Sequence, residues 1–148
     1  MKQKLNRVLR VRTILEDVSR LDYERKNADL SHLKHAAAEQ RQLERITRAD
    51  VLRMLAEGES AESWLLKIAD AEIMRWKEER IEALAESRAA EVGEAREELQ
   101  ARRIEKRQLE ALLSATARAE QREQARREQN RTDDWFQSRL PGSDRKRD

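Results

Sequence analysis

The stretch Glu57-Gly58-Glu59-Ser60-Ala61 is the one strong turn signal in the interior of the chain. Gly58 has no Cβ, so it can take the left-handed conformation that closes a helix C-terminus. Ser60 can cap a following helix by accepting a backbone N–H, and Glu62 lies near the positive end of that helix. The stretch therefore predicts a hairpin of two helices with a turn at about residues 58–60.

The composition agrees with long helices on both sides of this turn. The chain has 148 residues, of which 42% are charged and 38% are apolar, and its first 140 residues contain no proline and two glycines. Sandwiches, barrels and doubly wound folds need turn residues far more often than that. We therefore expect an all-α protein, a long antiparallel two-helix coiled-coil hairpin with a thin core.

The helix boundaries follow from where the apolar periodicity begins and stops. We expect helix 1 at about residues 5–57, helix 2 at about 61–138 and a flexible tail at 139–148, all in one coiled-coil domain. Pro141 stops helix 2 because proline disfavours a helical residue before it. Helix 2 is the longer of the two, so residues 118–138 should extend beyond helix 1 as a single helix.

Apolar residues recur in steps of three and four along both helices, as in the seam of a coiled coil. Helix 1 shows two phases, namely Val11, Ile14, Val18 and Leu21, then Leu30, Leu33, Ala37, Leu43, Ile46 and Met54. Helix 2 shows an early phase with Leu65, Ile68, Ile73 and Trp76, then Ile81, Ala85, Arg88, Val92, Ala95, Leu99, Arg102, Lys106, Leu109, Leu113 and Thr116. The slips between phases predict an imperfect supercoil.

The start of the chain is basic, although the net charge is only +2. Residues 1–15 contain five cations and no acid. Such a segment can lie on an anionic membrane surface or contact nucleic acid. The near-neutral chain and the lack of an aromatic stacking platform argue against nucleic acid. The simpler interpretation is an amphipathic helix end that packs on helix 2.

No group of residues predicts a catalytic site. A two-helix hairpin offers no shielded pocket in which catalytic groups could converge, and the chain has no cysteine and no Gly-rich phosphate loop. His32, His35 and Glu39 share a helix face and are of types that ligate zinc, but helix 2 has no second group of ligands. We expect a protein that is not an enzyme and holds no cofactor or metal.

Two of the five aromatic residues, Trp135 and Phe136, lie beyond the paired part of the expected hairpin. Large aromatic side chains without an intramolecular partner are typical of binding anchors. The alternative is that they fold back onto Leu5 and Leu9 at the start of helix 1. The sequence leaves both arrangements open.

Both ends of the sequence resemble a known family. The opening Met1-Lys2-Gln3-Lys4-Leu5-Asn6-Arg7-Val8-Leu9-Arg10-Val11-Arg12 looks like the start of the FliJ family of flagellar export proteins. The run Arg126-Arg127-Glu128-Gln129, followed by Asp133-Asp134 and Trp135-Phe136, is similar to that family's C-terminal signature. The matches cover about 26 of the 148 residues. The stalk proteins of virulence type III secretion, the YscO group, share the same architecture.

The resemblance implies a cytoplasmic component of a bacterial type III export apparatus, held at the inner face of the membrane through its partners alone. Family members are two-helix coiled coils similar to the central stalk of rotary ATPases. They insert their terminal end into the hexamer of the export ATPase, promote its assembly and activity, and contact the cytoplasmic domain of the export gate protein. Some also bind export chaperones.

The resemblance also implies where the partners bind. The contact with the ATPase ring, or the packing of the terminal end, would involve Leu5, Val8, Leu9, Arg12, Arg127, Gln129, Asp134, Trp135 and Phe136. No motif matches for the export gate, where the candidates are apolar residues outside the continuous seam, Leu43, Ile46, Ile73 and Trp76. Two other classes stay open, a structural homo-oligomeric coiled coil and a basic membrane or nucleic acid binder.

Overall fold

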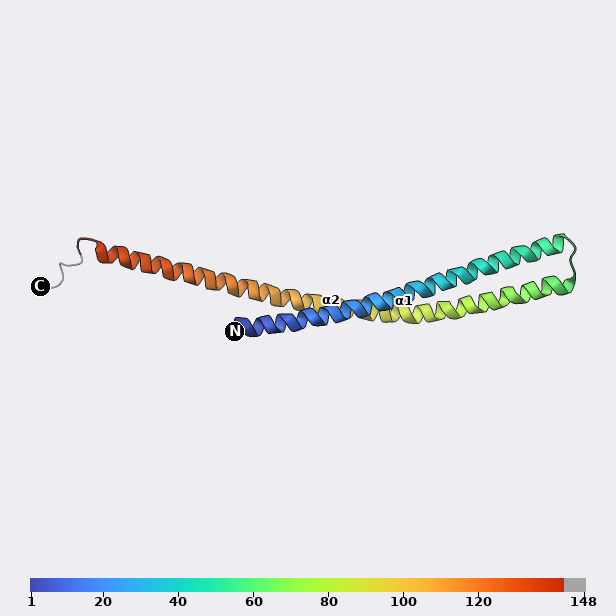
Figure 1. Ribbon diagram of the computed structural model, residues 1–148, viewed down its shortest axis with the longest axis horizontal. Helices are drawn as coiled ribbons and strands as arrows, with labels where there is room; N and C mark the ends of the chain where they lie inside the picture. Colours follow the sequence, from blue (N-terminus) through green and yellow to red (C-terminus); the bar gives the residue numbers. More distant parts are fainter. Residues whose placement is uncertain (143–148) are drawn as a thin grey trace. The chain divides into compact units, whose positions relative to one another are not determined.

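The computed structural model describes residues 1–142, which form two helices and no strand (Figure 1). Helix α1 is Lys2–Ala56 and helix α2 is Ala61–Arg139. The two helices pack on each other as a hairpin, so the predicted all-α fold class is confirmed. Of the predicted flexible tail at 139–148, residues 143–148 lie outside the described residues. Arg139 belongs instead to α2, and a turn follows at Pro141.

The turn between the helices forms as its sequence predicts. Gly58 has a φ of 69°, in the left-handed region. The N–H of Glu59 donates to the carbonyl of Met54 at 3.1 Å, and the N–H of Gly58 donates to that of Leu55 at 3.3 Å. This pair of bonds is the Schellman motif, which satisfies the last carbonyls of α1.

Ser60 begins α2, but its side chain differs from the prediction. The Ser60 carbonyl accepts from the N–H of Ser63 at 3.1 Å, as at the start of a helix. The Ser60 hydroxyl lies 2.9 Å from the Ser63 hydroxyl, so its partner is a side chain and not the expected backbone N–H. The position is therefore a helix start without the predicted side-chain cap.

The chain divides into two compact units, which we name the tip unit (Ile14–Arg103) and the terminal unit (Met1–Thr13 with α2 from Ile104). In the tip unit the least exposed side chains form one seam that alternates steps of three and four without a break. Its α1 members are Glu16, Ser19, Tyr23, Lys26, Leu30, Leu33, Ala37, Gln40, Glu44, Thr47, Val51 and Met54. Its α2 members are Trp64, Lys67, Ala71, Met74, Glu78, Ile81, Ala85, Arg88, Val92, Ala95, Leu99 and Arg102.

The predicted phase at the start of helix 1 is wrong. Val11, Ile14, Val18 and Leu21 are each more than half exposed. The seam next to the last three runs through Glu16, Ser19 and Tyr23, although these residues are polar or only partly apolar. A straight run of heptads cannot change phase without an insertion, so the buried residues Leu30, Ala37, Val51 and Met54 set the phase of the whole helix.

The predicted slip in helix 2 is also wrong. Met74, Glu78 and Ile81 continue the seam in steps of four and three. Leu65, Ile73 and Trp76 are each about half exposed, on other faces of the helix. The longer predicted phase, which begins at Ile81 and includes Ala85, Arg88, Val92, Ala95, Leu99 and Arg102, coincides with the observed seam.

The core of the tip unit is thin and partly polar. Six of its ten buried residues are alanines or hydroxyl residues and only four are larger apolar residues: Ser19, Leu30, Ala37, Thr47, Val51, Met54, Ala71, Ala85, Ala95 and Leu99. Small seam residues let two helices approach closely but bury little apolar area each. Ion pairs between the two helices flank the seam, such as Arg48 with Glu72 at 3.1 Å.

The terminal unit pairs the start of α1 with α2 as the hairpin register predicts. Leu5 and Leu9 are half-buried, and Leu5 lines a cavity of about 40 Å³ with Leu113 and Thr116. Lys2 forms an ion pair with Glu120 at 3.7 Å. None of the described residues of this unit is buried, whereas ten residues of the tip unit are, so its packing is lighter than that of the tip unit. In the described part of the chain neither helix is long and apolar enough to cross a membrane.

Candidate functional site

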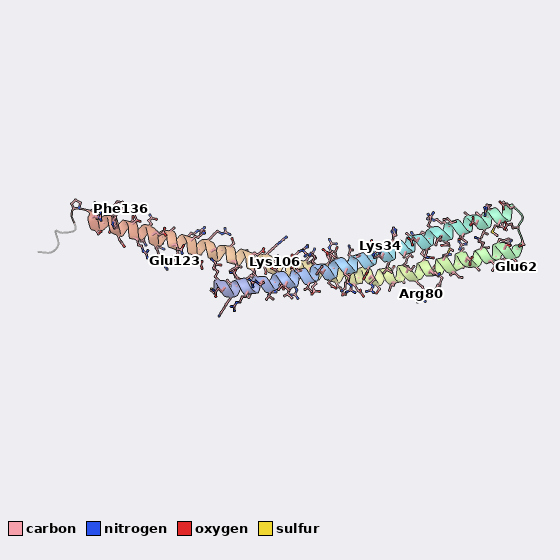
Figure 2. All side chains as sticks on the ribbon, viewed as in Figure 1. Lys34, Glu62, Arg80, Lys106, Glu123 and Phe136 are labelled. Carbon is pink, nitrogen blue, oxygen red and sulfur yellow. The ribbon has the colours of Figure 1, made fainter. Side chains whose placement is uncertain are left out.

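Beyond Glu120, α2 continues as a helix without a partner on α1. We call residues 121–139 the terminal extension. All of its side chains are exposed, and Glu123 and Phe136 mark its course in Figure 2. The extension is held by local contacts, such as the ion pair between Glu123 and Arg127. Pairs of opposite charge four residues apart stabilise a lone helix modestly, which explains why this charged sequence stays helical.

Near the end of the extension, three side chains form an aromatic cluster. The rings of Trp135 and Phe136 meet edge to face, with centroids 5.1 Å apart and planes at 83°. The guanidinium of Arg139 lies 4.3 Å from the centroid of Trp135. Trp135 is half exposed and Phe136 is 59% exposed, and no other element of the terminal unit covers them. The cluster is an ordered apolar surface with a cationic rim.

The aromatic residues do not fold back onto the start of α1. Leu5 packs against Leu113 and Thr116 instead. From Glu120 to Phe136 the helix rises by roughly 24 Å, so the cluster lies well beyond the last ion pair with α1. Of the two arrangements that the sequence leaves open, the structure has the uncovered one.

The residues proposed for the ATPase ring contact therefore fall into two groups. Leu5, Leu9 and Arg12 lie at the seam of the terminal unit, where Arg12 forms an ion pair with Glu105. Val8 is on the same turn of α1 but is exposed. The other five are exposed along the extension, namely Arg127, Gln129, Asp134, Trp135 and Phe136. The two groups do not form a single site, since only the first contacts both helices.

The candidates for the gate contact lie on the surface of the tip unit. Leu43, Ile46, Ile73 and Trp76 are each about half exposed and lie outside the seam. Trp76 is covered on one side by the guanidinium of Arg80, which lies 4.9 Å from its ring centroid. These side chains are accessible to a partner and form no closed pocket.

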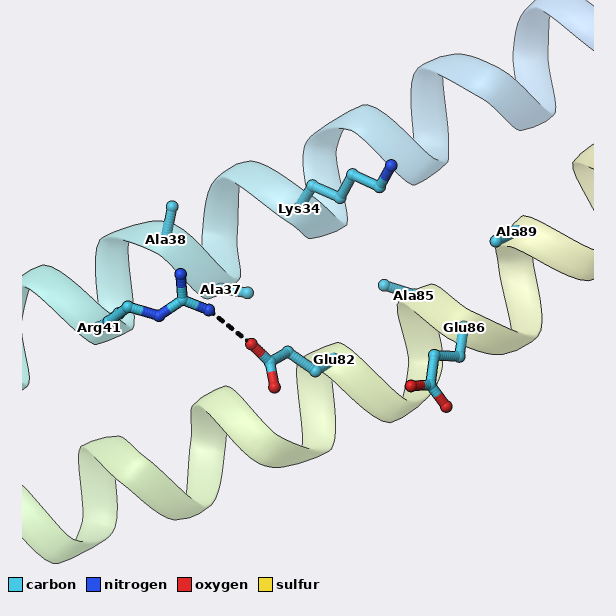
Figure 3. A pocket seen from close by; sticks show the side chains of 8 residues that line it. All are labelled: Lys34, Ala37, Ala38, Arg41, Glu82, Ala85, Glu86 and Ala89. Carbon is cyan, nitrogen blue, oxygen red and sulfur yellow. Dashed lines mark hydrogen bonds and ion pairs between the residues drawn. The ribbon is translucent and has the colours of Figure 1, made fainter.

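An open groove of about 410 Å³ crosses the tip unit where both helices carry alanine (Figure 3). Ala37, Ala38, Ala85 and Ala89 line it, and Ala37 and Ala85 point towards each other while Ala38 points away from α2. Arg41 closes one end by donating to Glu78 at 2.8 Å and to Glu82 at 2.7 Å.

Those hydrogen bonds, with Glu78 first and Glu82 second, raise the pKa of the Arg41 guanidinium above its ordinary value, so it stays charged. Lys34 and Glu86 also line the groove. The groove is thus lined by four alanines and four charged side chains.

The described residues hold no cluster of three or more side chains that could ligate a metal ion. His32, His35 and Glu39 are all exposed on α1.

Sequence reasoning missed one surface feature, the apolar outer face of each helix. The sequence pattern predicts Ile14, Val18 and Leu21 at the seam, although they lie on the exposed side opposite it. The signal was available, because continuing the phase of Leu30, Leu33 and Ala37 backwards places the seam at Tyr23 and Glu16.

Comparisons with known proteins identify no relative. No protein-family model, curated protein or solved structure matches the chain. The resemblance of the two ends to the FliJ family therefore stands on the terminal residues alone.

Proposed function

We propose that this chain is the central stalk of a flagellar type III export ATPase. In this proposal it has no catalytic activity of its own, promotes assembly and activity of the ATPase hexamer, and couples the hexamer to the cytoplasmic domain of the export gate. Export chaperones are a further class of partner. The setting would be the cytoplasm, at the inner face of the bacterial membrane.

The observation that carries the proposal is the aromatic cluster on an unpaired helix. Trp135 and Phe136 lie within the stretch that resembles the family's C-terminal signature, and both are exposed. A lone helix that projects from a hairpin and ends in exposed aromatic residues suits insertion into a ring-shaped partner.

The mechanism would be differential binding. The stalk can raise the activity of an ATPase only by binding one conformation of the ring more tightly than the others. The nucleotide site would belong to the partner. Leu43 and Ile46, exposed apolar residues of the tip unit, would contact the export gate.

The test is the ATP hydrolysis rate of the export ATPase from the same organism, with and without this chain. We expect the full chain to raise the rate and a chain truncated after Glu120 to leave it unchanged. Because the extension makes no contact with α1, the truncated chain should still fold as a hairpin, which circular dichroism would check.

A double substitution sharpens the test. Trp135→Ala with Phe136→Ala should abolish most of the stimulation, whereas Arg122→Ala with Asn130→Ala, exposed on the same helix, should keep it. An assembled ring that ignores the full chain would rule out the flagellar pairing. The equivalent ATPase of a virulence secretion system would then be assayed in the same way, since the YscO group shares the architecture.

A further inference from the structure

The tip unit carries apolar residues on the outer face of α1, opposite the seam. Ile14, Val18 and Leu21 follow steps of four and three, and each is more than half exposed. We call them the α1 outer stripe. At the same height the seam holds Glu16, Ser19 and Tyr23. In a coiled coil that acts alone the apolar residues face the partner helix and the outer positions are polar; here that distribution is reversed.

A matching set lies on the outer face of α2. Leu66, Ala69, Ile73 and Trp76 follow steps of three, four and three, and the three large ones are more than half exposed. We call them the α2 outer stripe. It lies beside the part of α1 near the turn, because Glu72 pairs with Arg48 and Lys67 pairs with Asp50.

Because a hairpin of heptads supercoils, we expect the two stripes to approach a common side of the tip unit. They lie about 30 residues apart along the hairpin, or roughly 45 Å. The ribbons cross within the tip unit in Figure 1, as a left-handed supercoil of heptads requires. At a pitch of about 150 Å this distance corresponds to a turn of roughly 110°. At any one height the outer faces of α1 and α2 point in opposite directions. After a turn of roughly 110° the directions of the two stripes differ by about 70°, so one neighbouring molecule can contact both.

We propose that the partner for these stripes is a second copy of this chain, in an antiparallel two-fold dimer. The two helices of a hairpin are antiparallel, so a two-fold axis across the hairpin sets α1 of one copy parallel to α2 of the other. The α1 outer stripe of each copy then packs on the α2 outer stripe of its partner. The same contact occurs twice, as a two-fold interface demands.

One register fits both stripes. Pairing each residue of the α1 outer stripe with the residue 55 positions later on the partner sets Ile14 on Ala69, Val18 on Ile73 and Leu21 on Trp76. The heptad positions coincide in every pair, which is the condition for regular packing of parallel helices.

The charges beside the stripes give one favourable and one unfavourable contact in this register. In a parallel pair of helices, a residue beside the apolar stripe of one helix meets the residue five positions further along on the other helix. In this register Asp17 of one copy therefore meets Lys77 of the other. Among the described residues Lys77 has no ion-pair partner within its own chain, whereas Asp17 already pairs with Arg20 at 3.2 Å. The same rule brings together two acids, Asp22 and Glu72, but each already has a base, Lys26 at 3.1 Å and Arg48 at 3.1 Å.

Sedimentation equilibrium of the full chain over a concentration series tests the proposal. We expect a monomer–dimer equilibrium with no larger species. Val18→Glu and Ile73→Glu should each raise the dissociation constant about tenfold or more, since each buries a charge in the interface. Leu52→Glu is the control, because Leu52 is exposed and lies on neither stripe. All three positions are on the surface, so thermal melts by circular dichroism should stay alike.

Cysteine cross-linking tests the register, since the chain has no cysteine of its own. A chain with Val18→Cys and Ile73→Cys should form disulfide-linked dimers under mild oxidation. A chain with Val18→Cys and Ala90→Cys should not, because Ala90 is exposed on α2 but lies far from the expected contact. Each single cysteine variant should remain uncrosslinked.

Three results would overturn the proposal. These are a monomer at every concentration, a dimer that ignores Val18→Glu and Ile73→Glu, and efficient cross-linking of Val18→Cys to itself. The proposal does not rest on the stalk function, because none of these experiments involves an ATPase and the terminal extension plays no part in the contact.

Discussion

At the scale of single residues, the two interior glycines show opposite roles for the same side chain. Gly58 adopts a φ of 69°, where a Cβ is strained. Gly93 is in the middle of α2, where glycine has no conformational advantage. A Cβ at either position would meet no heavy atom within 4 Å. Their substitutions therefore report on the backbone alone.

Gly58→Ala should lower the free energy of unfolding by about 1 kcal/mol, because alanine disfavours the left-handed region. Gly93→Ala should raise it by about 0.5–1 kcal/mol, because alanine is the better helix former. Urea unfolding followed by circular dichroism measures both. Equal signs for the two changes would contradict this assignment of the turn.

Arg41→Gln should lower the melting temperature slightly at low salt and not at high salt. Arg41 bridges two carboxylates, Glu78 and Glu82, across the helices, but all three groups meet solvent and salt screens such contacts. Melts of the wild type and the variant at two salt concentrations measure the effect, with Arg75→Gln as the control, since Arg75 pairs only with Glu79 on its own helix. A penalty that persists in high salt would show that the bridge acts through packing.

At the scale of the elements, the sequence predicts the helices and the turn but only part of the seam. The turn is local chemistry, read correctly from Gly58. The position of the seam depends on the whole helix. A prediction from apolar residues alone is therefore wrong where polar residues such as Glu16 occupy seam positions. From Ile81 onward the seam is richer in apolar residues, and there the prediction is right.

Leu99→Ala should lower the free energy of unfolding by about 2–3 kcal/mol, since Leu99 is 4% exposed and truncation leaves a cavity. Leu84→Ala, at a half-exposed leucine on the same helix, should cost less than about 1 kcal/mol. Denaturant titrations of both variants compare them. Similar losses would mean that the seam does not run through Leu99.

At the scale of the whole molecule, the two units differ in how much they bury. The tip unit contains all ten buried residues, and the described part of the terminal unit contains none. Elements with few buried contacts open at lower free energy than the rest of a protein. The candidate ring contact thus lies in the part of the chain with the lighter packing, which sequence alone did not reveal because Leu5, Leu9, Leu109 and Leu113 suggested an ordinary seam.

Unfolding should therefore proceed in two steps. In a variant with Trp76→Phe and Trp135→Phe, the remaining tryptophan is Trp64, which lies at the seam of the tip unit. On heating, the helical signal of circular dichroism should begin to fall before the Trp64 fluorescence changes. Coincident transitions would show that the two units unfold together.

The terminal extension has a further consequence, for hydrogen exchange. Its backbone hydrogen bonds are covered by no second helix, so its amide protons should exchange with solvent much faster than those of the seam. In the free protein the amide protons of this segment should therefore be almost unprotected from exchange. Slow exchange appearing there in a mixture would then signal a bound partner, and the protected amides would trace its footprint residue by residue.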